Sequence, residues 1–111
     1  MEINVGVEQG ITVVALAGEL NARTAPDVLA RVLELAQPNC RLILDLTGIG
    51  FLSSAGVRVL LQVSRTVGGR GGRAVLAGLS PDVKNTLKII GFLGFFVHHD
   101  TLAAAVAALS A

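Results

Sequence analysis

Two adjacent serines, Ser53 and Ser54, carry hydroxyl groups at a position in the chain where one of them could be phosphorylated. They follow an apolar segment and precede a helical pattern, so they stand where a strand and a loop lead into the first turn of a helix. The first turn of a helix presents unpaired amides and a partial positive charge, which favour an anion such as a phosphate carried on serine. The alternative is that one serine only caps the helix, and the residue types leave both interpretations open.

Three other groups could carry chemistry, and each has a simpler interpretation. His98, His99 and Asp100 offer metal-ligand atoms, but neighbouring strand residues point to opposite faces, so we expect a strand end with Asp100 as a helix cap. Cys40 lacks a Cys-His signature and is expected to be a small buried residue. The glycine-rich run 68–72 lacks the ending of a phosphate loop and should be a turn. We therefore predict no catalytic residue, no metal site and no cofactor.

The composition of the chain limits its domain count and its partners. It has 111 residues, 52% hydrophobic and 15% charged, which predicts one domain over residues 1–111. A net charge of +1, with no Trp or Tyr and 4 Phe, argues against nucleic acid and against an anionic membrane as partners. The single cysteine, the lack of a secretion signal and the lack of a long apolar run lead us to expect a soluble cytoplasmic protein.

The elements that position the two serines alternate between strand and helix. Strands are predicted at residues 3–7, 11–17, 42–46, 74–77 and 95–97. Helices are predicted to follow Thr24 with Asp27 as a capping box, the paired serines, Ser80 with Pro81 and Asp82, and Asp100. Residues 47–52 are predicted to form the loop that leads to the serines. The order ββαβαβαβα defines an α/β fold.

Two of the predicted helices have a clear division between apolar and polar faces. The first should pack on the sheet through Val28, Leu29, Val32, Leu35 and Ala36. The second, which begins at the serines, is largely apolar apart from a narrow polar stripe of Arg58, Gln62 and Arg65. We therefore expect the second helix to be mostly buried, with the polar stripe as its exposed edge.

Five segments, taken in order, resemble the landmarks of a known family. They are Gly18-Glu19-Leu20-Asn21 followed by Thr24, Leu42 to Leu46, Phe51-Leu52-Ser53-Ser54-Ala55-Gly56, Leu79-Ser80-Pro81-Asp82-Val83, and Gly91-Phe92. Their order and spacing are similar to those of the bacterial anti-sigma factor antagonists, which are STAS domains, and the likeness covers nearly the whole chain. The resemblance implies a single STAS domain whose mixed central β-sheet carries helices mainly on one side.

The resemblance also implies a function. Such a protein takes part in a partner-switching phosphorylation cycle, binding an anti-sigma factor with serine kinase activity while unphosphorylated and leaving it when a serine is phosphorylated. A serine phosphatase restores binding. The chain itself would be a substrate and no enzyme, a monomer or weak dimer that regulates transcription in a bacterial stress response. The alternative is a STAS accessory or ligand-sensing module of a transporter or lipid-trafficking complex, without a phosphorylation cycle.

The family motif, usually Asp-Ser followed by Ser or Ala and then Gly, implies that Ser54 is the phosphoacceptor. Ser53 stands where many members have Asp, and it is the alternative acceptor. Asn21 likewise stands where many relatives have Asp, and it should preserve hydrogen bonding with less negative charge.

We expect the partner-binding surface to combine loops 18–24 and 48–54 with the exposed edge of the second helix, because loops at one end of a rigid sheet often carry function. Its residues are Glu19, Asn21, Thr24, Gly50, Phe51, Leu52, Ser53, Ala55, Gly56 and Arg58. Phe51 fits either the core or the interface. Arg58 lies four residues after Ser54, where many relatives have glycine, and is either a solvated arginine or the partner of a phosphorylated Ser54.

Overall fold

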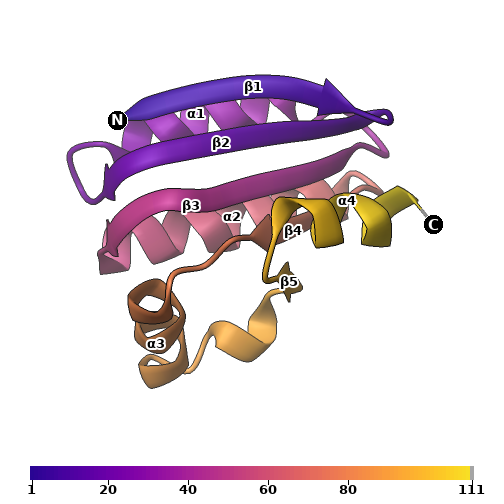
Figure 1. Cartoon of the computed structure of the whole chain (residues 1–111). Coiled ribbons are helices and arrows are strands. Elements are labelled where there is room, and N and C mark those ends of the chain that lie inside the picture. The colour runs from indigo at the N-terminus through magenta and orange to yellow at the C-terminus, as the bar shows by residue number, and fades with distance from the viewer. Residues whose placement is uncertain (111) are drawn as a thin grey trace.

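One mixed β-sheet forms the centre of the protein (Figure 1), whose computed structural model describes residues 1–110. Its strands are β1 (Glu2–Glu8), β2 (Ile11–Leu20), β3 (Arg41–Leu52), β4 (Arg73–Ala77) and β5 (His98–His99). They lie in the order β1-β2-β3-β4-β5, with β1 antiparallel to β2 and every later pair of neighbours parallel. The predicted α/β fold and its element order are confirmed.

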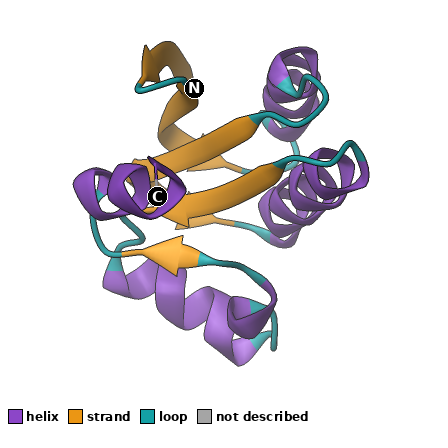
Figure 2. Ribbon diagram, turned by 90° about the vertical axis from the view of Figure 1, so that its right-hand side faces the viewer, coloured by secondary structure: helices purple, strands orange, loops and turns teal. Residues whose placement is uncertain are grey.

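Of the four helices within residues 1–110, three pack on one face of this sheet. The helices are α1 (Ala25–Leu35), α2 (Ser54–Gly69), α3 (Pro81–Ile89) and α4 (Leu102–Ser110). Figure 2 shows α1 and α2 on one face and α4 on the opposite face. On the α1 and α2 side, α3 contributes Val83 and Leu87 to the same core. The helices therefore lie mainly on one side, as the resemblance implied.

Alternate residues of the central strands fill two separate cores. On β3, Leu42 and Leu44 belong to the larger core, under α1 and α2, while Ile43 belongs to the smaller core, under α4. Burying one such side chain completely stabilises the fold by about 1.5–3 kcal/mol. Val28 and Val32 are fully buried in the larger core, which confirms the apolar face predicted for α1. The result is a rigid sheet whose strand ends can hold loops in fixed positions.

Residues 47–52, predicted as a loop, instead continue β3 as far as Leu52. Their pairing with β2 passes through two shifts of register, so this end of the strand is irregular. At Gly48 an added Cβ would lie 2.9 Å from both the Ala17 Cβ and the Leu16 carbonyl oxygen. The glycine that suggested a loop is required for a close approach between two strands.

The last strand is His98–His99, and the prediction of residues 95–97 is wrong. Leu93–Phe95 forms a single 3₁₀ turn, and Phe96 is buried in the larger core. The apolar run before the strand therefore packs on the larger core through Phe96 and, in part, Leu93. It reaches β4 at its end, where the Val97 carbonyl oxygen accepts a hydrogen bond from the Leu76 amide at 2.9 Å.

The caps of the last two helices follow different rules. Ser80 Oγ accepts a hydrogen bond from the Val83 amide at 3.2 Å, which confirms the predicted cap of α3. At α4, Thr101 Oγ1 accepts from the Ala104 amide at 3.1 Å, so the prediction of Asp100 as the cap is wrong by one residue. The Asp100 carboxylate is instead exposed to solvent.

Candidate functional site

Ser53 ties the start of α2 to the end of β2. Its backbone amide and its Oγ both donate to the Leu20 carbonyl oxygen, at 3.0 and 3.3 Å. The Ser53 Oγ also accepts a hydrogen bond from the Gly56 amide at 3.4 Å, which partly satisfies the unpaired amides of the first helical turn. The interpretation that one serine caps this helix is confirmed for Ser53.

Ser54, the first residue of α2, differs from Ser53 in exposure and in bonding. Ser54 is exposed, whereas Ser53 is half-buried. Among residues 1–110, no hydrogen-bond partner of the Ser54 hydroxyl is found. The first turn of α2 also carries no acidic residue, so no carboxylate there offsets the partial positive charge of the helix start. Ser54 therefore offers a free hydroxyl in a setting that suits a negative charge.

The loop between β2 and α1 is held by its own polar side chains. Thr24 Oγ1 accepts from the Asn21 amide at 3.0 Å and donates to the Glu19 carbonyl oxygen at 2.9 Å. The Asn21 Oδ1 accepts from the Thr24 amide at 3.3 Å. The capping box predicted for Thr24 and Asp27 is therefore wrong, since Thr24 makes no side-chain cap and its hydroxyl serves the loop. These bonds bring three predicted site residues, Glu19, Asn21 and Thr24, into one fixed turn.

Two of the predicted contact residues lie beneath the surface. Leu52 is 4% exposed and belongs to the larger core. Gly56 is buried, and an added Cβ would lie 2.7 Å from both the Leu20 carbonyl oxygen and the Leu52 Cδ1. Both residues position the start of α2 against β2, and their side chains offer little to a partner.

The other predicted residues form an exposed surface at the carboxyl ends of β2 and β3. Phe51 is 54% exposed and pairs in register with Glu19, so its side chain belongs to the surface and not to the core. Gly50 is exposed beside it. Ala55 and Arg58 line a groove of about 370 Å³ between α1 and α2. We call this region the Ser54 surface; it consists of Ser54 together with Glu19, Gly50, Phe51, Ala55 and Arg58.

The remaining candidates from the sequence offer less chemistry. Cys40 is partly buried, and burial raises the pKa of its thiol, which disfavours the nucleophilic thiolate. The glycine run 68–72 ends α2 and leads into β4, as predicted. Residues 1–110 contain no cluster of three or more His, Cys, Asp or Glu that could hold a metal ion. Over the same residues, no helix is long and apolar enough to cross a membrane.

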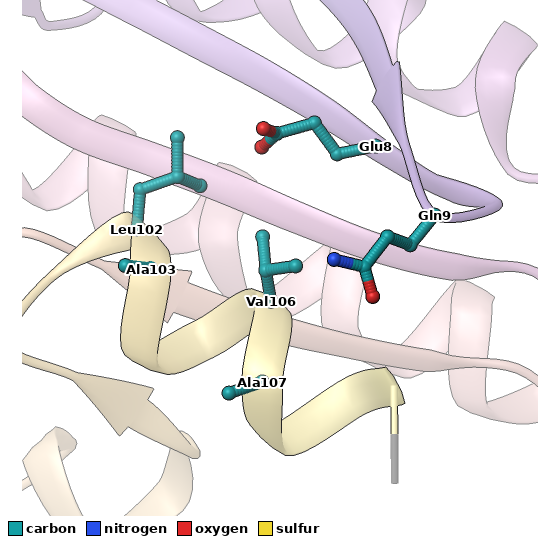
Figure 3. Close-up of a pocket in the computed structure, with 6 residues that line it drawn as sticks. All are labelled: Glu8, Gln9, Leu102, Ala103, Val106 and Ala107. Atoms are coloured by element: carbon teal, nitrogen blue, oxygen red, sulfur yellow. The ribbon is translucent and has the colours of Figure 1, made fainter.

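A second hollow of about 370 Å³ lies between the turn of the β1–β2 hairpin and α4 (Figure 3). Its lining residues are Glu8, Gln9, Leu102, Ala103, Val106 and Ala107. Among these, Glu8 is the only ionisable side chain, so the hollow lacks the pair of groups that acid–base or nucleophilic catalysis requires. The Ser54 surface is the better candidate for function.

The sequence did not suggest that the apolar segment from Ile89, the last residue of α3, to Val97 would have exposed side chains. Ile89, Phe95 and Val97 are 75%, 50% and 55% exposed. The Arg65 guanidinium lies 6.0 Å from the centroid of the Phe95 ring, so the segment adjoins the polar stripe of α2. Two glycines, Gly91 and Gly94, interrupt this apolar run, and they were the available signal that it does not form one buried element.

Comparisons with known proteins agree with this architecture. A family model of the STAS domain matches residues 2–106. BtrV of Bordetella bronchiseptica, named as an anti-sigma factor antagonist, is 31% identical over 109 residues, covering 97% of this chain and 94% of BtrV.

Solved structures share the fold. An anti-sigma factor antagonist from Mycobacterium paratuberculosis superposes with a TM-score of 0.86 at 24% identity, covering 99% of this chain and 94% of that one. SpoIIAA of Bacillus, in its phosphorylated form, superposes with a TM-score of 0.71 at 19% identity, covering 97% and 99%. The chain therefore belongs to the STAS domain family, in which it is similar to anti-sigma factor antagonists.

Proposed function

We propose that this protein is an anti-sigma factor antagonist that works by a partner switch. The unphosphorylated protein binds an anti-sigma factor with serine kinase activity through the Ser54 surface. Phosphorylation of Ser54 ends this binding, and a serine phosphatase restores it. The name of BtrV supports the antagonist role, and the phosphorylated form of SpoIIAA, a protein of the same fold, supports the phosphorylation step.

The observation that carries this proposal is the contrast between the two serines. Ser53 is committed to the fold, because its hydroxyl bonds both Leu20 and Gly56. Ser54 is exposed, one residue further on, with no hydroxyl bond found among residues 1–110. A phosphate on Ser54 therefore requires no rearrangement of α2, whereas a phosphate on Ser53 would displace the cap.

The protein is the substrate of the phosphoryl transfer and supplies only the accepting oxygen. A bond forms between the γ-phosphorus of ATP and Ser54 Oγ, the bond from that phosphorus to the bridging oxygen breaks, and ADP leaves. The proton of the Ser54 hydroxyl passes to a base of the kinase. The chain's own part is to present that oxygen at a fixed and exposed point, which its rigid connection to β2 provides.

The effect of the phosphate on binding follows from charge and hydration. A phosphoserine adds about −1.5 to −2 charges and a strongly hydrated group. The Ser54 surface also carries the exposed Phe51 ring and the apolar α1–α2 groove, which Ala55, the residue after Ser54, helps to line. A partner that binds this surface must cover these apolar groups closely. Covering the phosphate would cost its hydration, so phosphorylation weakens binding without any change of fold.

The test is to incubate the purified protein with ATP and each serine kinase encoded beside its gene, and to map phosphate by mass spectrometry. We expect one phosphate, on Ser54, and a loss of kinase affinity of more than about tenfold, measured by calorimetry. Absence of phosphate with every such kinase would overturn the partner switch and favour an accessory or ligand-sensing STAS module. Phosphate that persists in Ser54→Ala but disappears in Ser53→Ala would move the acceptor to Ser53.

A further inference from the structure

Arg58 lies on the same side of α2 as Ser54, one helical turn further on. Residues four apart on a helix have Cβ atoms about 5–6 Å from each other. Helical side chains lean toward the N-terminus of their helix, so the long Arg58 side chain is directed back toward the first turn. An acidic group placed four residues before a basic one is also the more favourable order of such a pair. The guanidinium can therefore reach a phosphate on Ser54.

Arg58 is free to make that contact. It is exposed, and no carboxylate among residues 1–110 lies within ion-pair distance of it. Two other arginines already donate to backbone carbonyl oxygens. Arg41 donates to the Leu109 carbonyl oxygen at 2.8 Å, and Arg70 donates to the Ala36 carbonyl oxygen at 2.7 Å. The N–H groups of the Arg58 guanidinium are therefore available as hydrogen-bond donors, and their planar arrangement matches the oxygens of a phosphate.

Arg58 is the cation of α2 that lies nearest to Ser54 in the sequence. Glu19 at the end of β2, Asp27 in the first turn of α1 and Asp82 in the first turn of α3 carry negative charges at this end of the sheet. Two further cations lie at this end of the sheet: Arg23 in the loop before α1, and the amino group of Met1, which lies beside Gly18 of β2. The acidic groups belong to other elements, and none stands in the first turn of α2. Within α2 itself, a phosphate on Ser54 would therefore meet Arg58 and the helix amides with no competing carboxylate.

We propose that Arg58 is the internal counterion of phosphorylated Ser54, a clamp that folds onto the phosphate and leaves the rim of the α1–α2 groove. The presence of the phosphate rests on the proposed function. In the unmodified protein Arg58 lines that groove with Ala22 of the loop before α1 and with Pro26 and Leu29 of α1. Phosphorylation then changes two features of the Ser54 surface at once, because a bound phosphate appears and the groove loses its cation.

The test installs phosphoserine at position 54 during translation, so that it depends on no kinase. The second pKa of a free phosphoserine is about 6, and a nearby cation lowers it because it stabilises the dianion. We expect phosphorus NMR titration to give a pKa about 0.2–0.7 lower in the parent protein than in Arg58→Gln. Arg65→Gln is the matched control, since it removes a cation of the same stripe that lies eleven residues from Ser54.

Two further measurements separate a clamp from a general charge effect. Arg58→Lys keeps the charge without the fork and should recover only part of the lowering. The Arg58 Nε–H resonance should move and exchange more slowly with solvent after phosphorylation in the parent protein. Equal phosphate pKa values in the parent protein and in Arg58→Gln would overturn the clamp. A rise of this pKa in Arg65→Gln as large as the rise in Arg58→Gln would overturn it as well. Neither result depends on whether a kinase acts on Ser54, so failure of the proposed function is recognised separately by the kinase experiment.

Discussion

The Leu20 carbonyl oxygen accepts two hydrogen bonds from Ser53, from its amide at 3.0 Å and from its Oγ at 3.3 Å. This double contact joins the end of β2 to the start of α2, two points separated by 33 residues in the chain. It fixes the position of Ser54, the next residue, relative to the sheet. A chemical change at Ser54 is therefore presented on a rigid surface, and its effects are local.

Substitutions at Ser54 should separate the two states of the switch. Ser54→Ala removes the accepting oxygen and should keep the kinase partner bound at the affinity of the unmodified protein, even with ATP present. Ser54→Asp brings negative charge to the same point and should weaken binding by more than about threefold, since a single carboxylate carries less charge than a phosphate. Calorimetry with the kinase measures both. Equal affinities of the two variants would contradict the role of charge at this position.

Ser53 should matter for stability more than for modification. Loss of an N-cap hydroxyl costs about 0.5–2 kcal/mol, so Ser53→Ala should lower the free energy of unfolding by that amount. Ser54→Ala is the matched control and should change it by less than about 0.5 kcal/mol, because the removed hydroxyl is exposed. Urea denaturation of both variants measures the difference. A larger loss in Ser54→Ala than in Ser53→Ala would show that the caps are assigned to the wrong serine.

Gly56 should tolerate no side chain. A Cβ at this position would lie 2.7 Å from the Leu20 carbonyl oxygen, so Gly56→Ala must push α2 away from β2 at a cost of about 1–3 kcal/mol. Gly68 is a control in the same helix, where an added Cβ meets no atom within 4 Å. Gly68→Ala should stabilise the protein by about 0.5–1 kcal/mol through helix propensity. Opposite signs in urea denaturation are expected, and a neutral Gly56→Ala would contradict the close packing.

Cys40 should react slowly while the protein is folded. Burial raises the pKa of its thiol above the ordinary value of 9.0, which lowers the thiolate fraction. The contribution of this group to stability is complete below the unfolded-state pKa and is lost as the pH rises through the higher folded-state value. Because the chain has 1 cysteine, alkylation by iodoacetamide reports on it alone. We expect slower alkylation at pH 8 in the native protein than in urea, and equal rates would contradict the burial.

The features that could be predicted from the sequence are those with local causes. The cap of α3 follows from Ser80 and its first-turn proline, which act within three residues of each other. The strands 11–17 and 42–46 follow from continuous apolar runs that are buried on both faces. The order of the elements depends only on such local signals, and it is confirmed.

The errors arise where a residue bonds or packs against a distant part of the chain. Thr24 was a good candidate for a helix cap, but the Glu19 carbonyl oxygen takes its hydroxyl. Gly48 suggested a loop, although its function is a close approach to Ala17 on the next strand. The division of roles between the two serines depends on the same kind of contact, because Leu20 lies far from Ser53 in the sequence. Local patterns carry no information about such partners.

The location of the partner surface can be tested with two phenylalanines of similar exposure. Phe51 is 54% exposed on the Ser54 surface, and Phe95 is 50% exposed on the apolar segment after α3. Truncating a central aromatic contact in an interface costs about 2 kcal/mol or more, so Phe51→Ala should weaken binding to the kinase by roughly thirtyfold. Phe95→Ala should leave the affinity within about threefold, although it removes a ring of the same size from an equally exposed position. Calorimetry gives both affinities, and circular dichroism checks that both variants fold. The reverse order of effects would place the partner on the segment 89–97, and no effect of either variant with a large effect of a change in α4 would place it on the opposite face of the sheet.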